Sequence, residues 1–122
     1  MYWAFYNCQA LVSVDLGNVT DVSDYGLHDC FNGCTSLRYV NFRNMSNIDN
    51  LGLNSTFENC TALELIDWSN ATKVPNIGVN TFKNASSNFR VIIPDSLYSS
   101  WRLQTNWYSF RNQLVKLSEY TP

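Results

Sequence analysis

The stretch Phe57-Glu-Asn-Cys-Thr-Ala-Leu-Glu-Leu-Ile-Asp-Trp68 occurs nearly four times in this chain. Similar copies occupy residues 31–42 and 5–16, and a degenerate copy begins near residue 82. The first aromatic residue of each copy recurs at steps of 26, 26 and 25 residues: Phe5, Phe31, Phe57 and Phe82. A fixed period of about 20–50 residues is typical of a solenoid, in which each repeat buries its apolar side against its neighbours.

When the copies are aligned on their first aromatic residue, equivalent positions form columns. Two apolar columns are separated by one position, as in a short strand. The pairs are Val14 and Leu16, Val40 and Phe42, and Ile66 and Trp68. Because side chains alternate between the two faces of a strand, each pair predicts a strand with one face in the core. We expect successive strands to form a parallel sheet, about 4.8 Å apart. The Ser, Asn and Asp residues between the strands predict irregular or short 3-10 arcs on the outer side.

Composition limits the class of protein. The 122 residues and 14.0 kDa predict one domain with a modest core. A net charge of −2 and a pI near 5.1 offer no basic patch, so nucleic acid is not an expected partner. No apolar run approaches the roughly 18 residues of a membrane span. The N-terminal residues lack the features of a signal peptide, so we expect a cytoplasmic or virion-borne protein or a fragment of a longer one.

The repeat pattern ends at Pro94, because proline cannot continue a strand ladder. We therefore predict about four repeats of period 26 in residues 1–94 and a C-terminal cap in residues 95–122. The physical need for a cap is that the open apolar edge of the last repeat must be covered.

Within the cap, helical spacing alternates with turns. Asp95 and Ser96 are favourable N-cap residues for a first helix. The spacing of Trp107, Phe110 and Leu114 predicts a second helical face, and residues 114–117 predict a closing strand. We expect four of these side chains in the core: Leu97, Trp101, Trp107 and Phe110.

The spacing within the repeats resembles a known family. The second repeat has the spacing Cys34-x-x-Leu37-x-x-Val40-x-Phe42-x-x-Met45-x-x-Ile48, and a later segment is Ile77-Gly-Val-Asn-Thr-Phe82. Both resemble the BspA-like (Treponema-type) leucine-rich repeat of bacterial surface and phage-encoded proteins, although a period of 26 is longer than usual for it. The resemblance implies a right-handed leucine-rich-repeat solenoid, closed by a small helical C-terminal cap.

The resemblance also implies a function, which is protein binding rather than catalysis. The main expectation is an adhesion module at a bacterial cell surface, attached to host or partner proteins as part of a longer chain. A structural or receptor-binding component of a bacteriophage is the first alternative. A second alternative, from another class, is an enzyme with a carboxylate site.

The residues with chemical potential favour a structural role. Cys8, Cys34 and Cys60 share one column without a histidine, so we expect small buried residues there and no metal. Cys30 lies outside this column and is the better candidate for a free thiol. His28 aligns with turn residues, and we expect it to face solvent. We expect no cofactor and no catalytic residue.

The exposed face of the strands is the candidate binding surface. Positions that alternate with the core columns must point outward. The predicted surface comprises Ser13, Asp15, Tyr39, Asn41, Leu65 and Asp67. Arg90 and Ile92 of the fourth repeat extend the same columns. Aromatic residues with a polar tip are favoured at binding surfaces, whereas the alternative is a face that is only solvated. Asp15 and Asp67 form a ladder interrupted by an amide, unlike the facing carboxylates of a glycosidase.

The N-terminal edge of the first repeat lacks a recognisable cover. Only four residues precede Phe5, among them Tyr2 and Trp3. An unpaired strand edge is a template for another chain. We therefore expect further repeats, self-association of two copies about a two-fold axis, or another protein at this edge.

Overall fold

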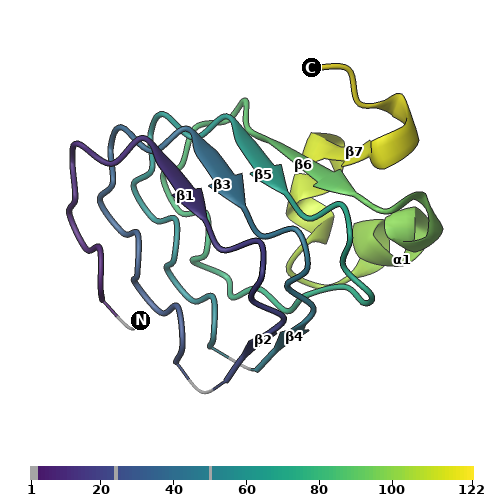
Figure 1. Cartoon of the computed structure of the whole chain (residues 1–122), viewed down its shortest axis with the longest axis horizontal. Coiled ribbons are helices and arrows are strands. Elements are labelled where there is room, and N and C mark those ends of the chain that lie inside the picture. Colours follow the sequence, from purple (N-terminus) through teal and green to yellow (C-terminus); the bar gives the residue numbers. More distant parts are fainter. Residues whose placement is uncertain (1–2, 24, 50) are drawn as a thin grey trace.

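The computed structural model describes residues 3–23, 25–49 and 51–122, which form a stack of similar coils (Figure 1). Each coil contributes a short strand to a parallel sheet of order β1-β3-β5-β6-β7. The strands of this sheet are β1 (Ser13–Asp15), β3 (Tyr39–Asn41), β5 (Leu65–Asp67), β6 (Arg90–Ile93) and β7 (Leu114–Lys116). The parallel sheet predicted from the alternating columns is therefore confirmed.

The register of the strands also follows the sequence columns. Val14 pairs with Val40, which in turn pairs with Ile66. In the degenerate fourth repeat, Leu65 pairs with Arg90 as the column predicts. Ile92 differs, because it is only 4% exposed and does not face solvent as expected. It pairs with Val115 of β7, and the chain beyond β7 returns to the sheet face.

Two further short strands lie at a corner of the coil. They are β2 (Asp21–Val22) and β4 (Asn47–Ile48), which pair in parallel as a second sheet (Figure 1). The side chain of Asn47 donates a hydrogen bond to the carboxylate of Asp21 over 2.6 Å. Side-chain ladders of this kind add to the backbone bonds between neighbouring coils.

The outer arcs are joined by backbone hydrogen bonds in which the N–H groups of one coil donate to carbonyl groups of the next coil along the chain. The N–H of Phe5 donates to Cys30 O over 3.0 Å, and the N–H of Phe31 donates to Thr56 O over 3.2 Å. Between these donors, turn bonds such as Cys34 N–H to Phe31 O alternate along the arc. The described parts of the arcs contain turns rather than 3-10 helices. The prediction of irregular arcs is thus confirmed.

One column of the arc requires a left-handed backbone. Its φ angles are 58°, 80°, 63° and 57° at Asn7, Gly33, Asn59 and Asn84. Asparagine and glycine adopt this region at least cost, which explains part of the high Asn content. A Cβ atom on Gly33 would lie 1.9 Å from the amide oxygen of Asn7, so the glycine also permits close packing of the coils.

A ladder of phenylalanine rings forms the centre of the core. The ring centroids of Phe5 and Phe31 are 5.7 Å apart, those of Phe31 and Phe57 are 5.9 Å apart, and those of Phe57 and Phe82 are 5.7 Å apart. The interplanar angles of 12°, 12° and 7° show that the rings are stacked. The aromatic column that defines the repeat is therefore its packing contact.

The C-terminal segment packs against the last coil. It comprises η1 (Asp95–Leu97), α1 (Tyr98–Leu103), η2 (Tyr108–Gln113), β7 and η3 (Leu117–Glu119). The rings of Trp101 and Trp107 are fully buried, with centroids 6.0 and 5.7 Å from that of Trp68. Leu97 and Phe110 are partly buried against the same cluster. The prediction that these four side chains join the core is confirmed.

Two details of this segment differ from the sequence prediction. Neither Asp95 nor Ser96 caps a helix; the carboxylate of Asp95 accepts hydrogen bonds from the N–H and hydroxyl of Ser118 instead. The second helical face is a 3-10 helix that ends at Gln113, whereas Leu114 begins β7, which confirms the predicted closing strand. None of the described helices has the length and apolarity needed to span a membrane.

Candidate binding surface on the strand face

The six residues predicted from the alternating columns lie together on the outer face of the sheet. They line a shallow hollow of about 290 Å³, together with Val14 and Val40. The side chain of Tyr39 is the most prominent apolar contact, with 44% of its surface exposed. Ser13 and Asp15 are also exposed, whereas Leu65 is half-buried. The strand alternation therefore placed this face correctly.

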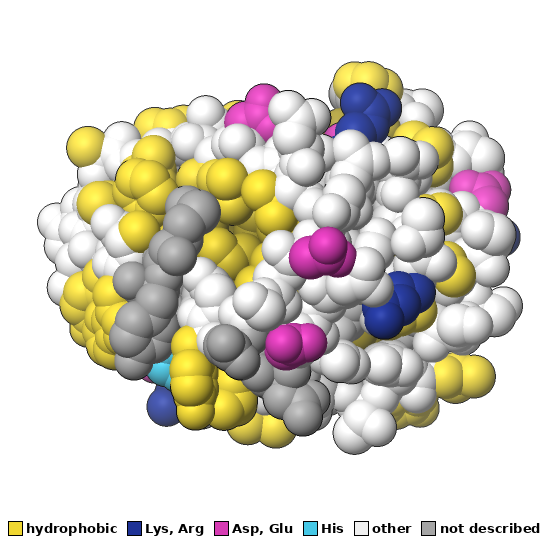
Figure 2. Space-filling model, turned by 60° about the horizontal axis from the view of Figure 1, so that its bottom comes forward, with side chains coloured by type: hydrophobic (Ala, Val, Ile, Leu, Met, Phe, Trp, Pro, Cys, Tyr) yellow, Lys and Arg dark blue, Asp and Glu magenta, His cyan; other side chains and the backbone are white. Residues whose placement is uncertain are grey.

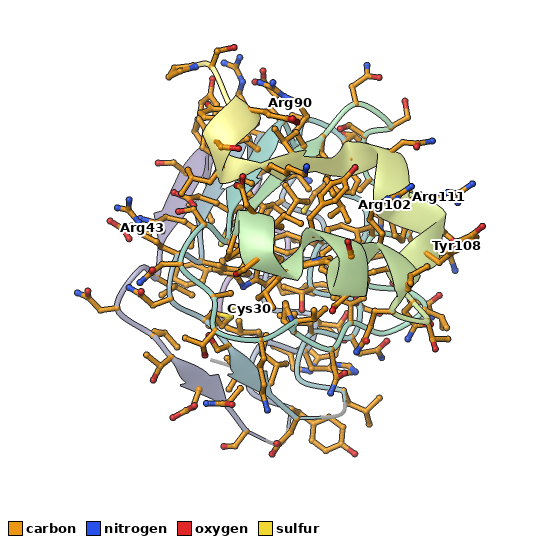
Figure 3. All side chains as sticks on the ribbon, turned by 90° about the vertical axis from the view of Figure 1, so that its right-hand side faces the viewer. Cys30, Arg43, Arg90, Arg102, Tyr108 and Arg111 are labelled. Atoms are coloured by element: carbon orange, nitrogen blue, oxygen red, sulfur yellow. The ribbon has the colours of Figure 1, made fainter. Side chains whose placement is uncertain are left out.

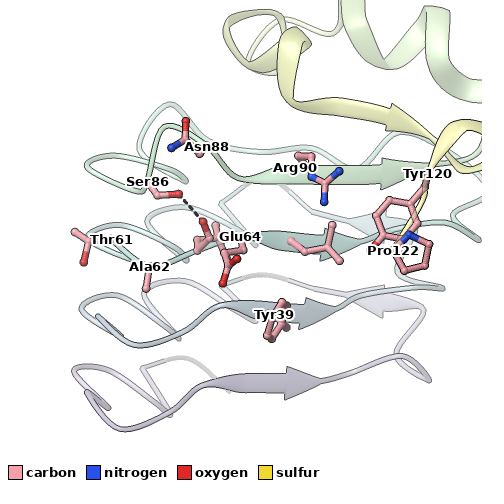
Figure 4. Close-up of a pocket in the computed structure, with 11 residues that line it drawn as sticks. Tyr39, Thr61, Ala62, Glu64, Ser86, Asn88, Arg90, Tyr120 and Pro122 are labelled. Atoms are coloured by element: carbon pink, nitrogen blue, oxygen red, sulfur yellow. Dashed lines mark hydrogen bonds between the residues drawn. The ribbon is translucent and has the colours of Figure 1, made fainter.

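A larger hollow adjoins the first and shares Tyr39 and Leu65 with it. It has a volume of about 530 Å³ and extends over β5 and β6 to the C-terminal tail. Figure 4 shows Tyr39, Arg90 and Tyr120 around this space, although they come from β3, β6 and the tail. Its remaining lining residues are Thr61, Ala62, Leu63, Glu64, Leu65, Ser86, Asn88 and Pro122.

Sequence reasoning missed most of this larger hollow. Thr61 and Ser86 precede the strands in turns, and alternation says nothing about turn positions. Tyr120 and Pro122 lie far along the chain from β3, and no spacing signal links them to it. The extension of the strand column to Arg90 was the one signal that pointed to this region.

The second polar column of the face stabilises turns. The side-chain oxygens of Asp15, Asn41 and Asp67 accept hydrogen bonds from backbone N–H groups two residues later, over 2.9, 3.0 and 2.8 Å. Such bonds explain why Asp or Asn occupies this column in the first three repeats. The two carboxylates remain separated by Asn41 in the register, so they form a ladder and not a facing pair.

Two arginines stack on tyrosine rings at the edge of the face. Arg38 donates a hydrogen bond to Glu64, which raises the pKa of its guanidinium group, and lies 5.3 Å from the ring centroid of Tyr39. Arg90 lies 5.5 Å from the ring centroid of Tyr120. These contacts orient both tyrosine side chains around the hollows.

Two thiols of the cysteine column contact backbone carbonyls of the preceding coil. The thiol of Cys34 donates to Phe5 O over 3.0 Å, and that of Cys60 donates to Phe31 O over 3.2 Å. Burial raises the pKa of Cys60 to about 12 and that of Cys30 to about 11, so these thiols stay protonated at neutral pH. All four cysteines are free. The prediction that Cys30 is the better candidate for a free thiol is not confirmed, because all four cysteines are free and Cys30 is completely buried.

The prediction that His28 faces solvent is wrong. Only 19% of its side chain is exposed, and its Nδ1 lies 2.6 Å from the carboxylate of Asp29. The amide of Asn54 and the ring of Tyr25 also contact it. The close stacking of the arcs places equivalent side chains against one another, which buries this turn residue. Within the described ranges, no group of three His, Cys, Asp or Glu residues is arranged to hold a metal.

The stacked coils, the phenylalanine ladder and the exposed parallel strands define a leucine-rich-repeat protein. Residues 2–115 match the family model described as BspA type Leucine rich repeat region (6 copies), and the chain belongs to this family. No curated protein and no solved structure gave a significant match. The repeat family is typically non-catalytic and is typically associated with bacterial surfaces, and leucine-rich repeats generally mediate protein interactions.

Proposed function

We propose that this chain is a non-enzymatic protein-binding module and that its strand face is the binding surface. The observation that supports this most is the pair of adjoining hollows that share Tyr39 and Leu65. An exposed tyrosine beside an aliphatic side chain, surrounded by polar groups, has the composition of an interface hot spot. The larger hollow also has a volume in the range of about 300–1,000 Å³ that is usual for ligand sites.

The biological setting that we propose is adhesion at a bacterial surface. The association of the family with bacterial surfaces supports this setting. A bacteriophage structural or receptor-binding component is the alternative. The two are distinguished by physical context: a signal peptide on a longer reading frame supports the first, and co-purification with virions supports the second.

The direct experiment measures binding of the chain to immobilised extracellular-matrix and cell-surface proteins by interferometry. Tyr39→Ala combined with Leu65→Ala should weaken any binding by more than about 1 kcal/mol, because the shared contact is removed. Val79→Ala combined with Leu103→Ala is the matched control, since these side chains are 79% and 74% exposed and lie outside both hollows. Equal binding by the two folded double variants would contradict the assignment of this face.

Two further parts of the proposal concern the ends of the stack. We assign residues 1–94 to the repeats and residues 95–122 to a cap, on the basis of the contacts of Trp101 and Trp107 with Trp68. We also assign an interaction role to the N-terminal edge, where a second polypeptide would cover partly buried apolar side chains. Those side chains are Phe5, Leu11, Val14 and Leu16.

A further inference from the structure

Arg90 is a cation without a carboxylate partner in the part of the chain that the structure describes. The ion pairs found there join His28 to Asp29 and Arg38 to Glu64. The guanidinium group of Arg90 instead lies over the ring of Tyr120 and lines the larger hollow (Figure 4). The stacking contact holds the planar group while leaving its edge N–H donors available in the plane of the group.

The charge around this hollow favours an anionic ligand group. Glu64 is the one acidic residue among those that line it, and Arg38 already neutralises that carboxylate. Among the described side chains that line the hollow, Arg90 is therefore a cation that no side-chain carboxylate pairs with, in a chain whose net charge is −2. A guanidinium group offers a fork of donors that matches a carboxylate through two parallel hydrogen bonds. A single cation is too few for a nucleic acid, which requires several phosphate contacts.

The apolar side chains of Tyr39 and Leu65 lie at a defined distance from the position of Arg90. The register aligns Tyr39, Leu65 and Arg90 in one column across three neighbouring strands. With strands about 4.8 Å apart, the point between Tyr39 and Leu65 is about 7 Å from the position of Arg90. Side chains two residues apart in an extended peptide are separated by a similar distance, about 6.6 Å.

We propose that the larger hollow binds an extended protein segment in which an apolar side chain and a side-chain carboxylate are two residues apart. The apolar group contacts Tyr39 and Leu65, and the carboxylate pairs with Arg90. The tail residues Tyr120 and Pro122 also line this hollow. This inference rests on the proposed function and specifies the chemistry of the partner.

The experiment is an NMR titration of the ¹⁵N-labelled full chain with end-blocked peptides at millimolar concentration. The probe is acetyl-Ser-Leu-Ser-Glu-Ser-amide, and its reversed order, Ser-Glu-Ser-Leu-Ser, tests the direction of the bound segment. Three control peptides replace Glu with Gln, replace Leu with Ser, or place Leu and Glu side by side. At least one of the two spaced Leu–Glu peptides should shift β5 and β6 amides and the side-chain signal of Arg90. Each control should bind about fivefold more weakly or worse.

The matched variants are Arg90→Gln and Arg111→Gln. Arg111 also stacks on a tyrosine, with its guanidinium 4.2 Å from the ring centroid of Tyr108, but lies elsewhere on the C-terminal segment (Figure 3). Arg90→Gln should reduce affinity for the Glu peptide about fivefold and leave affinity for the Gln peptide unchanged. Arg111→Gln should leave both affinities unchanged.

Three outcomes would overturn the inference. Equal binding of the Glu and Gln peptides, with loss of both in the Tyr39→Ala and Leu65→Ala double variant, would reject the carboxylate while leaving the proposed function intact. Tighter binding of a peptide with a free C-terminus and no Glu would assign the carboxylate to a chain end. Absence of shifts with every peptide would reject the hollow as a peptide site, whereas the immobilised-protein experiment would still test the strand face.

Discussion

The two ends of the stack place equivalent side chains in different environments. In the first coil, Phe5 and Val14 are only partly buried, whereas their counterparts Phe31 and Val40 in the second coil are 0% and 3% exposed. At the other end, Trp107 covers the rings of Trp68 and Phe82. Hydrophobic side chains gather around a hollow on the underside of the molecule toward the N-terminal end (Figure 2). Burial in this fold therefore depends on the neighbouring coil as well as on the residue type.

The hydrogen bonds show the same asymmetry. Cys30 O and Asn32 O accept bonds from Phe5 and Asn7 of the preceding coil. Among the described residues, no backbone donor reaches the equivalent carbonyl of Tyr6. If two copies of the chain paired at this end about a two-fold axis, the carbonyl groups of one outer arc would face the carbonyl groups of the other. We therefore expect a polypeptide bound at this edge to supply N–H donors along the arc.

The largest difference between the ends should appear on removing a tryptophan. Trp107→Ala should lower the free energy of unfolding by about 3–5 kcal/mol, because it opens a cavity beside Trp68 and Phe82. It also removes the indole bond to Pro75 O, which spans 2.8 Å. Trp3→Ala should cost less than about 1 kcal/mol, since that side chain is 42% exposed. Urea denaturation of both variants measures the contrast, and equal losses would refute it.

The cysteine column should show a smaller difference between the first and second coils in the free energy of unfolding lost on substitution. Cys34→Ala should cost about 1–2 kcal/mol, because the thiol is buried and bonded to Phe5 O. Cys8→Ala should cost less, since that residue is only half-buried. Urea denaturation provides the comparison. Stoichiometric zinc in the purified protein, measured by elemental analysis, would show that the structural interpretation of this column is wrong.

Association through the N-terminal edge should respond to a single charge. Val12 is 46% exposed beside β1, so Val12→Lys should change the free energy of unfolding by no more than about 0.5 kcal/mol. The same change should abolish any self-association detected by light scattering. Leu103→Lys on the C-terminal segment is the control and should have no effect. A monomeric wild-type chain at all concentrations would rule out a second copy at this edge.

The smallest effect should concern the tail that borders the larger hollow. Hydrogen bonds from Ser118 lower the pKa of Asp95 below its usual 3.8. At a pH above that usual value the carboxylate is ionised and its hydrogen bonds with Ser118 hold the tail in place. The contact is lost as the pH falls through the lowered pKa of Asp95. The NMR signals of Tyr120 should shift in this acidic range, and Asp95→Asn should remove the transition. Persistence of the transition in that variant would contradict its assignment to Asp95.

The repeating core could be predicted from the sequence because each column supplied several independent examples of the same contact. The aromatic column at Phe5 and Phe31 and the strand column at Val14 and Val40 were both placed correctly. The C-terminal segment occurs once and has no such internal comparison. Local rules therefore assigned Asp95 to a helix cap, although its partner Ser118 is distant in sequence.

The candidate site also contains residues that local sequence rules predict and residues that depend on distant contacts. Tyr39 and Leu65 follow from strand alternation, which depends only on local backbone geometry. The position of Tyr120 at the larger hollow and the burial of Ile92 depend on the path of the tail across the sheet. The burial of His28 likewise depends on contacts between successive arcs.

Amide hydrogen exchange tests most directly whether the first described coil, with its partly buried Phe5, is less stable than the inner coils. Phe5 and Phe57 provide a matched pair, because their N–H groups make the same bond to the next coil over 3.0 and 2.9 Å. The Phe57 amide should exchange at least about tenfold more slowly than the Phe5 amide, since its coil is packed on both sides. Equal rates for the two amides would show that the coils open as one unit and that the first coil is no less stable than the inner coils.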